Sequence, residues 1–276
     1  YSSAASDVYK RQDERCEEII SIQTAGIAKR MEHARVQRLV IGISGGLGST
    51  LALLICARAC RLLGRPASDI LAVTMPGFGT TDRTRSNAVR MCRLLGAELR
   101  EIPISDACLQ HFRDIGHDPA ERTTTYENVQ ARERTQILMD LANKTRGLVV
   151  GTGDLSEIAL GWSTYNGDHM SMYAVNCSIP KTLIRCLIEH IAKESEPELA
   201  ATLVDISNTP VSPELLPPKD GVISQKTEDL VGPYELHDFF LYYMLRVTYE
   251  PLKIYRVAKL AFAGVYDAVS YTHLRA

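Results

Sequence analysis

Hydrophobic and polar positions follow two different periods along this chain. Short, β-branched apolar runs predict strands that are buried on both faces, and they lie at residues 38–43, 70–75, 99–104 and 148–153. Apolar residues recur every three or four positions in the segments between them, which predicts helices over residues 13–36, 51–63, 86–95 and 126–144. Strands that alternate with helices are typical of a parallel sheet covered on both faces. We therefore expect an α/β fold with a doubly wound parallel sheet.

The pattern changes beyond residue 205. The segment SNTPVSPELLPPKDG (207–221) is rich in proline, which predicts an ordered loop or lid rather than a core element. An aromatic helix is expected after it, over YELHDFFLYYMLR (234–246).

Two of the predicted strands run directly into turns of small residues. The strand at 38–43 ends in SGG and the strand at 148–153 in GTG, with Asp154 or Ser156 as the candidate cap of the next helix. In open α/β sheets, ligands bind at the carboxyl ends of the strands where the strand order reverses. If these two strands are neighbours, their loops face one crevice, and we expect the functional site there.

Composition narrows the classes of partner. The 276 residues carry a formal net charge of −2, so nothing indicates a nucleic acid or an anionic membrane as partner. No apolar run has the length of a membrane-spanning helix, and the N-terminus has no apolar signal core. Seven cysteines without a CxxC pair are typical of reduced thiols in a cytoplasmic protein. We expect Cys56, Cys60, Cys92 and Cys186 to be small, buried residues on helices.

The two ends of the chain do not continue the patterns beside them. We interpret residues 1–12 as a non-native or linker extension and residues 267–276 as a non-native extension. Residues 13–266 are then expected to form a single catalytic domain.

The stretch LVIGISGGLGST (39–50) indicates a phosphate loop. Its small residues add almost nothing to a core, but they expose backbone N–H groups and hydroxyls at the start of a helix, where an anion is favoured. A Walker loop is excluded because no Lys follows the glycines. A dinucleotide-binding GxGxxG loop is excluded because the third Gly is missing and no acidic residue follows the second strand. A tight strand-to-helix turn without a ligand stays open for this loop taken alone.

The order strand–SGGxxS–helix resembles the pyrophosphatase loop of the ATP pyrophosphatase superfamily. Longer segments resemble one branch of it, the NAD synthetases, and in particular the synthetase domain of the glutamine-dependent enzymes. They are MPGFGTTDRT (75–84), the stretch from TYENVQARER to GWSTYNGD (125–168), NCSIPKTLI (176–184) and SPELLPPKDGVISQKTEDLVGPYELHDFFLYYMLR (212–246). The resemblance covers residues 13–260, and it implies an adenine-nucleotide hydrolase-like, Rossmann-like form of the expected sheet.

The resemblance implies an ATP site. In the family, the loop that matches residues 44–49 holds the phosphates of ATP, Thr152 matches a threonine that contacts ATP, and Lys181 matches a lysine on the phosphates. Lys226 and Thr227 match a loop that closes over the nucleotide. The implied ATP-binding residues are Ser44, Gly45, Gly46, Gly48, Ser49, Thr152, Lys181, Lys226 and Thr227.

The resemblance also implies a site for deamido-NAD. Its residues are Asn128, Arg132, Glu157, Trp162, Ser163, Thr164 and Tyr165. Without the family, Asn128 and Arg132 would be ordinary polar residues of an amphipathic helix and Glu157 a solvated charge. Trp162 would be open between a core residue and a ring that stacks on a pyridine. Glu157 is the implied ligand of Mg²⁺, and Lys181 and Glu157 are the implied catalytic residues.

Three other polar residues receive no role in the site. Asp168 and His169 form too small a set of ligands for a metal site, and neither is assigned a role. His237, which lies among aromatic residues, is interpreted as packing.

The implied activity is that of a ligase. ATP would adenylate the nicotinate carboxylate of deamido-NAD with Mg²⁺ as cofactor, and ammonia would displace AMP to form NAD. The ammonia would be free or would come from a glutaminase domain, and the implied assembly is a homodimer. A non-catalytic nucleotide-binding remnant and another adenylating amidotransferase of the superfamily are the alternatives.

One position departs from the family pattern SGGxDS. The Asp of this pattern helps to hold Mg²⁺ on ATP, and here the position is Gly48. The departure predicts impaired catalysis with nucleotide binding retained. We expect an Asp to fit at this position if Gly48 has a negative φ.

Overall fold

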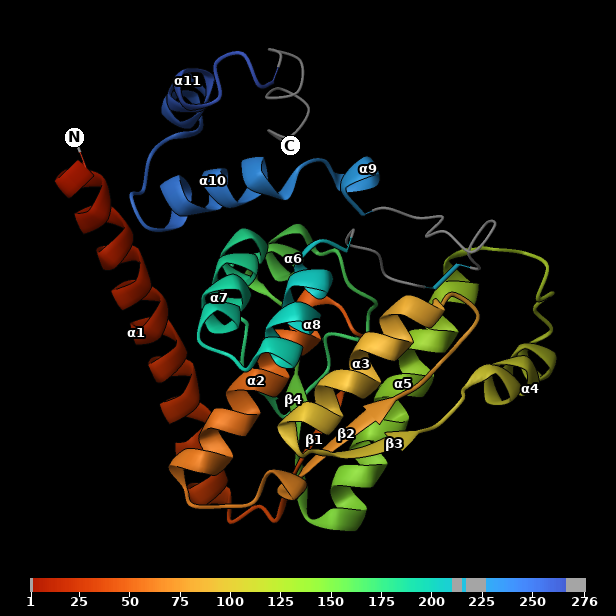
Figure 1. The fold of residues 1–276 in the computed structure, drawn as a ribbon. Coiled ribbons are helices and arrows are strands. Elements are labelled where there is room, and N and C mark those ends of the chain that lie inside the picture. The colour runs from red at the N-terminus through yellow and green to blue at the C-terminus, as the bar shows by residue number, and fades with distance from the viewer. Residues whose placement is uncertain (1, 210–214, 217–226, 267–276) are drawn as a thin grey trace.

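A parallel sheet of five strands lies at the centre of the molecule (Figure 1). The computed structural model describes residues 2–209, 215–216 and 227–266, with side chains from residue 12 onward. The strands are β1 (Arg38–Gly42), β2 (Ile70–Thr74), β3 (Glu98–Glu101), β4 (Gly147–Gly151) and β5 (Tyr173–Ala174). Their spatial order is β3-β2-β1-β4-β5, and every neighbouring pair is parallel. The doubly wound sheet predicted from the sequence is confirmed, with its change of direction between β1 and β4.

Both faces of the sheet are covered by helices because successive residues of each strand point to opposite sides. Leu39 and Ile41 of β1 join a buried cluster on one face, whereas Val40 joins a second cluster on the other. The first face carries α1 (Ser2–Ala34), α2 (Leu47–Leu62), α3 (Asp82–Leu95), α7 (Lys181–Lys193) and α8 (Pro197–Ser207). The second face carries α4 (Ser105–Ile115) and α5 (Thr124–Thr145). Burial on both faces explains why β1, β2 and β4 are continuous apolar runs, whereas the edge strand β3 is partly exposed and carries charged residues.

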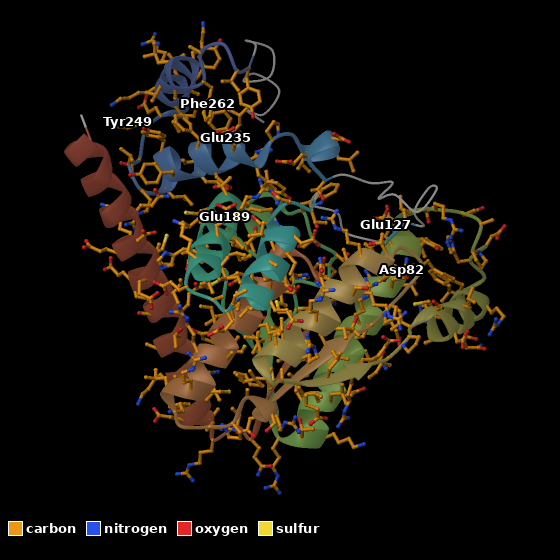
Figure 2. The ribbon with its side chains drawn as sticks, viewed as in Figure 1. Asp82, Glu127, Glu189, Glu235, Tyr249 and Phe262 are labelled. Atoms are coloured by element: carbon orange, nitrogen blue, oxygen red, sulfur yellow. The ribbon has the colours of Figure 1, made fainter. Side chains whose placement is uncertain are left out.

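The C-terminal helices form a layer of their own away from the sheet (Figure 1). α10 (Tyr234–Leu245) packs on α6 (Leu155–Leu160) and on α7, and α11 (Pro251–Ala261) packs on α10. Aromatic rings fill the contact between α10 and α11, where the centroids of Phe239 and Phe262 are 5.1 Å apart (Figure 2). The two remaining short elements are a 3-10 turn, η1 (Ala67–Asp69), and α9 (Thr227–Val231).

Several element boundaries differ from the prediction; the helix expected at 51–63, for example, already begins at Leu47. The helix expected at 86–95 begins at Asp82, because the side chain of Thr81 caps it by accepting a hydrogen bond from the Thr84 N–H. The strand expected at 99–104 ends at Glu101, although the N–H of Ile102 still donates to the Thr74 carbonyl at 2.9 Å. The two-residue strand β5 was not predicted, since so short a segment has no periodicity to detect.

The ends and the proline-rich segment lie partly outside the described residues. α1 extends the predicted helix at 13–36 back to Ser2, so it continues through the segment set aside as an extension. α8 reaches Ser207, and the proline-rich segment therefore starts later than residue 205. Residues 210–214, 217–226 and 267–276 are not described.

The cysteines are free thiols, and the expected burial is confirmed for three of the four residues named but is wrong for Cys186. Cys56, Cys60 and Cys92 are buried, Cys186 is half-buried, and all seven thiols are free. Burial raises the pKa of Cys92 to about 12, which keeps this thiol protonated and unreactive. Among the described residues, none of the helices combines the length and the apolar character needed to span a lipid bilayer.

Candidate functional site

A cavity of about 280 Å³ lies at the carboxyl ends of β1 and β4. β1 pairs directly with β4, so the loops that leave the two strands meet at the same edge of the sheet. The strands predicted to be neighbours are neighbours, and the crevice expected between their loops is present.

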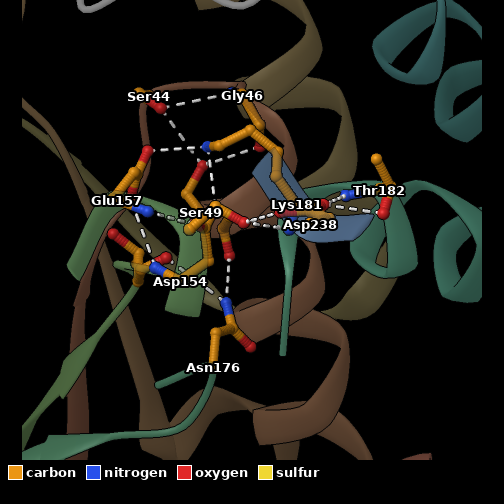
Figure 3. A network of polar contacts seen from close by, with 12 residues as sticks. Ser44, Gly46, Ser49, Asp154, Glu157, Asn176, Lys181, Thr182 and Asp238 are labelled. Atoms are coloured by element: carbon orange, nitrogen blue, oxygen red, sulfur yellow. Dashed lines mark hydrogen bonds and ion pairs between the residues drawn. The ribbon is translucent and has the colours of Figure 1, made fainter. Parts of the chain in front are cut away.

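The loop after β1 forms the first wall of the cavity (Figure 3). The hydroxyls of Ser44 and Ser49 are 3.2 Å apart, and Ser49 also donates to the Gly46 carbonyl at 3.1 Å. Gly46 is the N-cap of α2 and provides no side-chain cap, so the positive end of this 16-residue helix faces the cavity. The loop therefore offers hydroxyls and a helix N-terminus to an anion.

Gly45 allows this loop to adopt a backbone conformation that other residues would resist. Its φ is +85°, in the left-handed region, and a Cβ there would collide with the carbonyl of Thr84. Gly45 does not line the cavity.

The loop after β4 forms the second wall and starts α6. Asp154 is the N-cap of α6, as one of the two alternatives predicted: its Oδ1 accepts from the Glu157 N–H at 2.9 Å. In return, Glu157 Oε2 accepts from the Asp154 N–H at 3.2 Å, which completes a capping box. The side chain of Glu157 is thereby fixed at the wall of the cavity.

Lys181, the first residue of α7, lies between these two carboxylates (Figure 3). Its Nζ is 2.6 Å from Glu157 Oε1 and 2.7 Å from Asp154 Oδ2. Asp154 is fully buried, Lys181 is 5% exposed, and both Lys181 and Glu157 line the cavity. Asp154 and Lys181 are buried and Glu157 is partly exposed, and together they form a charged cluster at the meeting point of α6 and α7.

Burial and charge shift the pKa values of this cluster. Burial raises the pKa of Asp154 to about 6, and the charge of Glu157 acts in the same direction against the opposing effect of Lys181. Burial alone would lower the pKa of Lys181, but the charges of Glu157 and Asp154 outweigh it and raise that pKa above its usual value. The Lys181 ammonium therefore stays positively charged at neutral pH.

Asn176 ties the two loops together, and the sequence analysis did not single it out. Its Nδ2 donates to the Gly48 carbonyl at 2.9 Å and to the Thr152 carbonyl at 3.3 Å. Its Oδ1 accepts from Gln23 Nε2 at 3.1 Å, and the side chain is fully buried. The width between the loops is thus fixed by one amide side chain.

Gly48 stands where the two loops touch most closely. Its φ lies outside the left-handed region, so the backbone itself would admit a side chain. However, a Cβ at this position would lie 2.5 Å from the carbonyl oxygen of Thr152. The expectation that an Asp fits here once φ is negative is therefore wrong, because the loop after β4 would have to move.

The predicted site residues fall into two groups in this structure. The residues that line the cavity are Ser44, Gly46, Gly48, Ser49, Thr152, Glu157, Ser163 and Lys181. The residues outside its lining are Gly45, Asn128, Arg132, Trp162, Thr164, Tyr165 and Thr227. Lys226 lies outside the described residues.

The segment after α6 is largely at the surface. Trp162 is 36% exposed and Tyr165 is 75% exposed, which argues against the core interpretation of the Trp. The Tyr165 carbonyl accepts a hydrogen bond from Arg132 Nε at 3.1 Å, so this segment is bonded to α5. Asn128, on the same helix, is half-buried. These residues form a surface beside the cavity.

Two residues without an assigned role also line the cavity. Asp168 Oδ1 accepts from the Thr164 N–H at 2.7 Å, and the ring of His169 contacts the Thr164 carbonyl at 2.6 Å. They shape the backbone of the loop rather than form a metal site. His237, interpreted as packing, is buried against the Val231 carbonyl at 2.6 Å.

Comparison with known proteins gives a consistent result. The family model described as NAD synthase matches residues 19–247. The chain is 46% identical over 253 residues to a glutamine-dependent NAD(+) synthetase of Mycobacterium leprae. The aligned part is 89% of this chain but 37% of that protein, so the chain spans little more than a third of the length of this relative.

Solved structures show the same fold at low sequence identity. A glutamine-dependent NAD(+) synthetase from Cytophaga hutchinsonii matches with a TM-score of 0.75 at 17% identity, over 94% of this chain and 47% of that one. A glutamine-dependent NAD+ synthetase from Acinetobacter baumannii, solved in complex with ADP, matches with a TM-score of 0.65 at 23% identity, over 94% and 43%.

The close approach at Gly48 predicts a loss of stability on adding one methyl group. Gly48→Ala should lower the free energy of unfolding by roughly 1–3 kcal/mol, because the Thr152 backbone must move. Ala is otherwise favoured over Gly in a helix, so a loss of stability in this variant would have to come from the collision with the Thr152 carbonyl. Gly153→Ala is the control, since its Cβ would meet only Glu157 Oε2 at 3.7 Å. Urea unfolding of both variants measures the effect, and equal stabilities would contradict the collision.

The raised pKa of Asp154 predicts a pH dependence of stability. The folded chain holds this proton up to about pH 6, whereas an unfolded Asp releases it near pH 4. Protonated Asp154 therefore adds to the free energy of unfolding below about pH 4, and this stabilisation is lost as the pH rises through about 6. Asp154→Asn keeps an N-cap oxygen but cannot titrate. Relative to this variant, the wild type should lose roughly 1–3 kcal/mol of unfolding free energy between about pH 4 and pH 7. Urea unfolding across this range tests it, and parallel curves would contradict it.

Proposed function

This chain belongs to the NAD synthase family, and we propose that it catalyses the ATP-dependent amidation of deamido-NAD to NAD. The observation that carries the proposal is the cavity at the ends of β1 and β4. There a small-residue loop at a helix N-terminus faces a permanently charged ammonium and a carboxylate across one space, which is what a pyrophosphate-releasing site requires.

The proposed reaction has two steps. The nicotinate carboxylate attacks the α-phosphorus of ATP, the α–β phosphate bond breaks, and pyrophosphate leaves. Ammonia then attacks the carbonyl carbon of the adenylate, a proton is released, and AMP leaves with the electron pair of the broken C–O bond. The chemistry requires no side-chain nucleophile, so the work of the protein is alignment and charge neutralisation.

The cavity residues have distinct proposed roles in this reaction. The loop of residues 44–49 and Thr152 would hold the phosphates of ATP, with Lys226 and Thr227 closing over the nucleotide. Lys181 would offer its charge to the phosphates, since its pKa is raised and the ammonium persists at neutral pH. To do so it must exchange one of its carboxylate partners for phosphate oxygens. When ATP binds, phosphate oxygens would therefore replace a carboxylate as the partner of the Lys181 ammonium. The ammonium would lose little water in this exchange, because it is already buried.

The donor set fits a magnesium ion. Mg²⁺ in phosphate-transfer sites is held by one or two carboxylates together with substrate phosphates and water. Glu157 lines the cavity and supplies one such carboxylate, whereas Gly48 supplies none. When bound, Mg²⁺ would neutralise charge on the pyrophosphate, with Glu157 as its protein ligand.

The surface beside the cavity is the proposed site for the dinucleotide. Trp162, Ser163, Thr164 and Tyr165 would receive the nicotinate end, and Asn128, Arg132 and Glu157 would contact the rest. Because Trp162 and Tyr165 are exposed in a single chain, a homodimer with the dinucleotide near its interface is part of the proposal. Ammonia would arrive free or from a glutaminase domain, and the cytoplasm is the proposed location.

The experiment supplies ammonium, ATP, deamido-NAD and a magnesium series to the purified chain. NAD, AMP and pyrophosphate should form in equal amounts. Binding of both substrates without pyrophosphate release would identify a non-catalytic remnant, the alternative that Gly48 favours by supplying no carboxylate. Pyrophosphate release with another carboxylate, but not with deamido-NAD, would identify a different adenylating amidotransferase.

Replacing Lys181 should affect both ATP affinity and folding. Lys181→Ala removes a charge-assisted bond to phosphate that is worth roughly 1.5–3 kcal/mol. It also leaves Asp154 and Glu157 without their cation, which should cost about 3–5 kcal/mol of stability. Lys181→Arg is the comparison, since it keeps the charge. Titration calorimetry with ATP and thermal unfolding measure the two effects, and a loss of stability with unchanged ATP affinity would limit Lys181 to a structural role.

Replacing Trp162 should weaken dinucleotide binding selectively. Trp162 is 36% exposed, so Trp162→Ala should lower the melting temperature far less than the removal of a fully buried aromatic residue would. Lost stacking should raise the dissociation constant of deamido-NAD by an amount on the order of 1–3 kcal/mol, with ATP affinity unchanged. Tyr242→Ala, which removes a 57% exposed aromatic ring on α10, is the matched control. The assignment fails if both variants bind deamido-NAD equally well.

A further inference from the structure

The start of α7 has no cap from its own segment. Its N-cap is Pro180, which has no side-chain acceptor for the first N–H groups of the helix. Those groups find acceptors on other helices instead. The Lys181 N–H donates to Ser156 Oγ of α6 at 2.9 Å, and the Thr182 N–H donates to Asp238 Oδ2 of α10 at 2.9 Å. The first turn of α7 is therefore capped by residues from elsewhere in the chain.

Asp238 is at the centre of this arrangement (Figure 3). Its Oδ1 accepts a hydrogen bond from the Ser156 hydroxyl, and its Oδ2 accepts from the Thr182 hydroxyl at 2.7 Å as well as from the Thr182 N–H. The side chain is 8% exposed, and a carboxylate at the N-terminus of a helix is stabilised by the helix dipole. One buried carboxylate thus joins α6, α7 and α10.

α10 also contacts the other end of Lys181. The ring of Tyr234 lies one turn before Asp238, with its centroid 5.1 Å from Lys181 Nζ. This is within the range of a cation–π contact, and the ring is buried. α10 therefore constrains the backbone of Lys181 through Asp238 and Ser156, and its ammonium through Tyr234.

We propose that Asp238 is a positioning residue, which holds the first turn of α7 so that the Lys181 ammonium reaches the phosphates in the cavity. Asp238 does not line the cavity and would touch no substrate. The inference rests on the proposed function for the identity of the phosphate ligand, ATP. It extends the site to a helix of the C-terminal layer.

The substitution Asp238→Asn tests the role with little change in shape. In one orientation of the new amide, its NH₂ group faces the Thr182 N–H, so two donors oppose each other; in the other, it faces the Ser156 hydroxyl, which then loses its acceptor. Both orientations also remove the carboxylate charge from the N-terminus of α7, so its first turn is held less firmly. Glu235→Gln is the matched control, because it makes the same chemical change at an exposed position of the same helix (Figure 2).

Three quantities separate a positioning role from a purely structural one. They are the dissociation constants of ATP and of deamido-NAD in the presence of magnesium, and the melting temperature. Asp238→Asn should raise the dissociation constant of ATP about tenfold and leave the affinity for deamido-NAD within about twofold. Glu235→Gln should change none of the three. Unchanged ATP affinity, or an equal loss for both ligands, would overturn the inference.

A second variant covers the case in which Asp238→Asn does not fold. Thr182→Val removes only the 2.7 Å hydroxyl bond and keeps the N–H bond, so it should weaken ATP binding about two- to threefold with deamido-NAD binding unchanged. An unchanged affinity for ATP in this variant would count against positioning.

The outcomes also separate this inference from the proposed reaction. A wild-type chain that binds ATP but forms no NAD refutes the reaction, and the ATP affinities still decide the role of Asp238. A wild-type chain that forms NAD, with Asp238→Asn unchanged, refutes only the positioning role. A wild-type chain that does not bind ATP refutes both.

Discussion

The direct pairing of β1 with β4 is the constraint on which the site depends. These strands are separated by more than 100 residues of sequence, and their register sets Ile41 beside Val150. Because the pairing is parallel, the loops that follow the two strands emerge at one edge, and Asn176 then bonds to a carbonyl of each. The sheet therefore brings the two loops to one edge and Asn176 fixes the distance between them, so a ligand meets two walls that are already in place.

Before any ligand binds, the site already holds two carboxylates around its one ammonium. Lys181 lies between Asp154 and Glu157, both within 2.7 Å of its Nζ, so the buried ammonium is fully paired. An anionic ligand that enters the cavity competes with carboxylates rather than with water. Under the proposed function, this arrangement would favour a strongly charged group such as a pyrophosphate, since a weak anion would not compensate for the loss of a buried ion pair.

Local features of this protein could be predicted from the sequence, whereas contacts between residues far apart in the sequence could not. Continuous apolar runs predicted β1, β2 and β4, and Asp154 was one of two candidate caps predicted for the helix after β4. The roles of Asn176 and Asp238 depend on contacts across 128 and 82 residues, for which no periodicity exists. The wrong expectation that an Asp fits at Gly48 has the same origin. It was based on φ, which is a local property, whereas the Thr152 carbonyl that excludes a Cβ belongs to the loop after β4.

The capping of α7 by Asp238 also bears on the order of folding. The bonds from Asp238 to Thr182 and Ser156 close loops of 56 and 82 residues. Contacts so far apart in sequence form after local helices, because the entropy of loop closure is lost before the contact is gained. During synthesis, the first turn of α7 leaves the ribosome well before α10 exists. The lysine that faces the cavity therefore gains its final support only when the C-terminal layer docks, which makes the cavity one of the last parts of the molecule to mature.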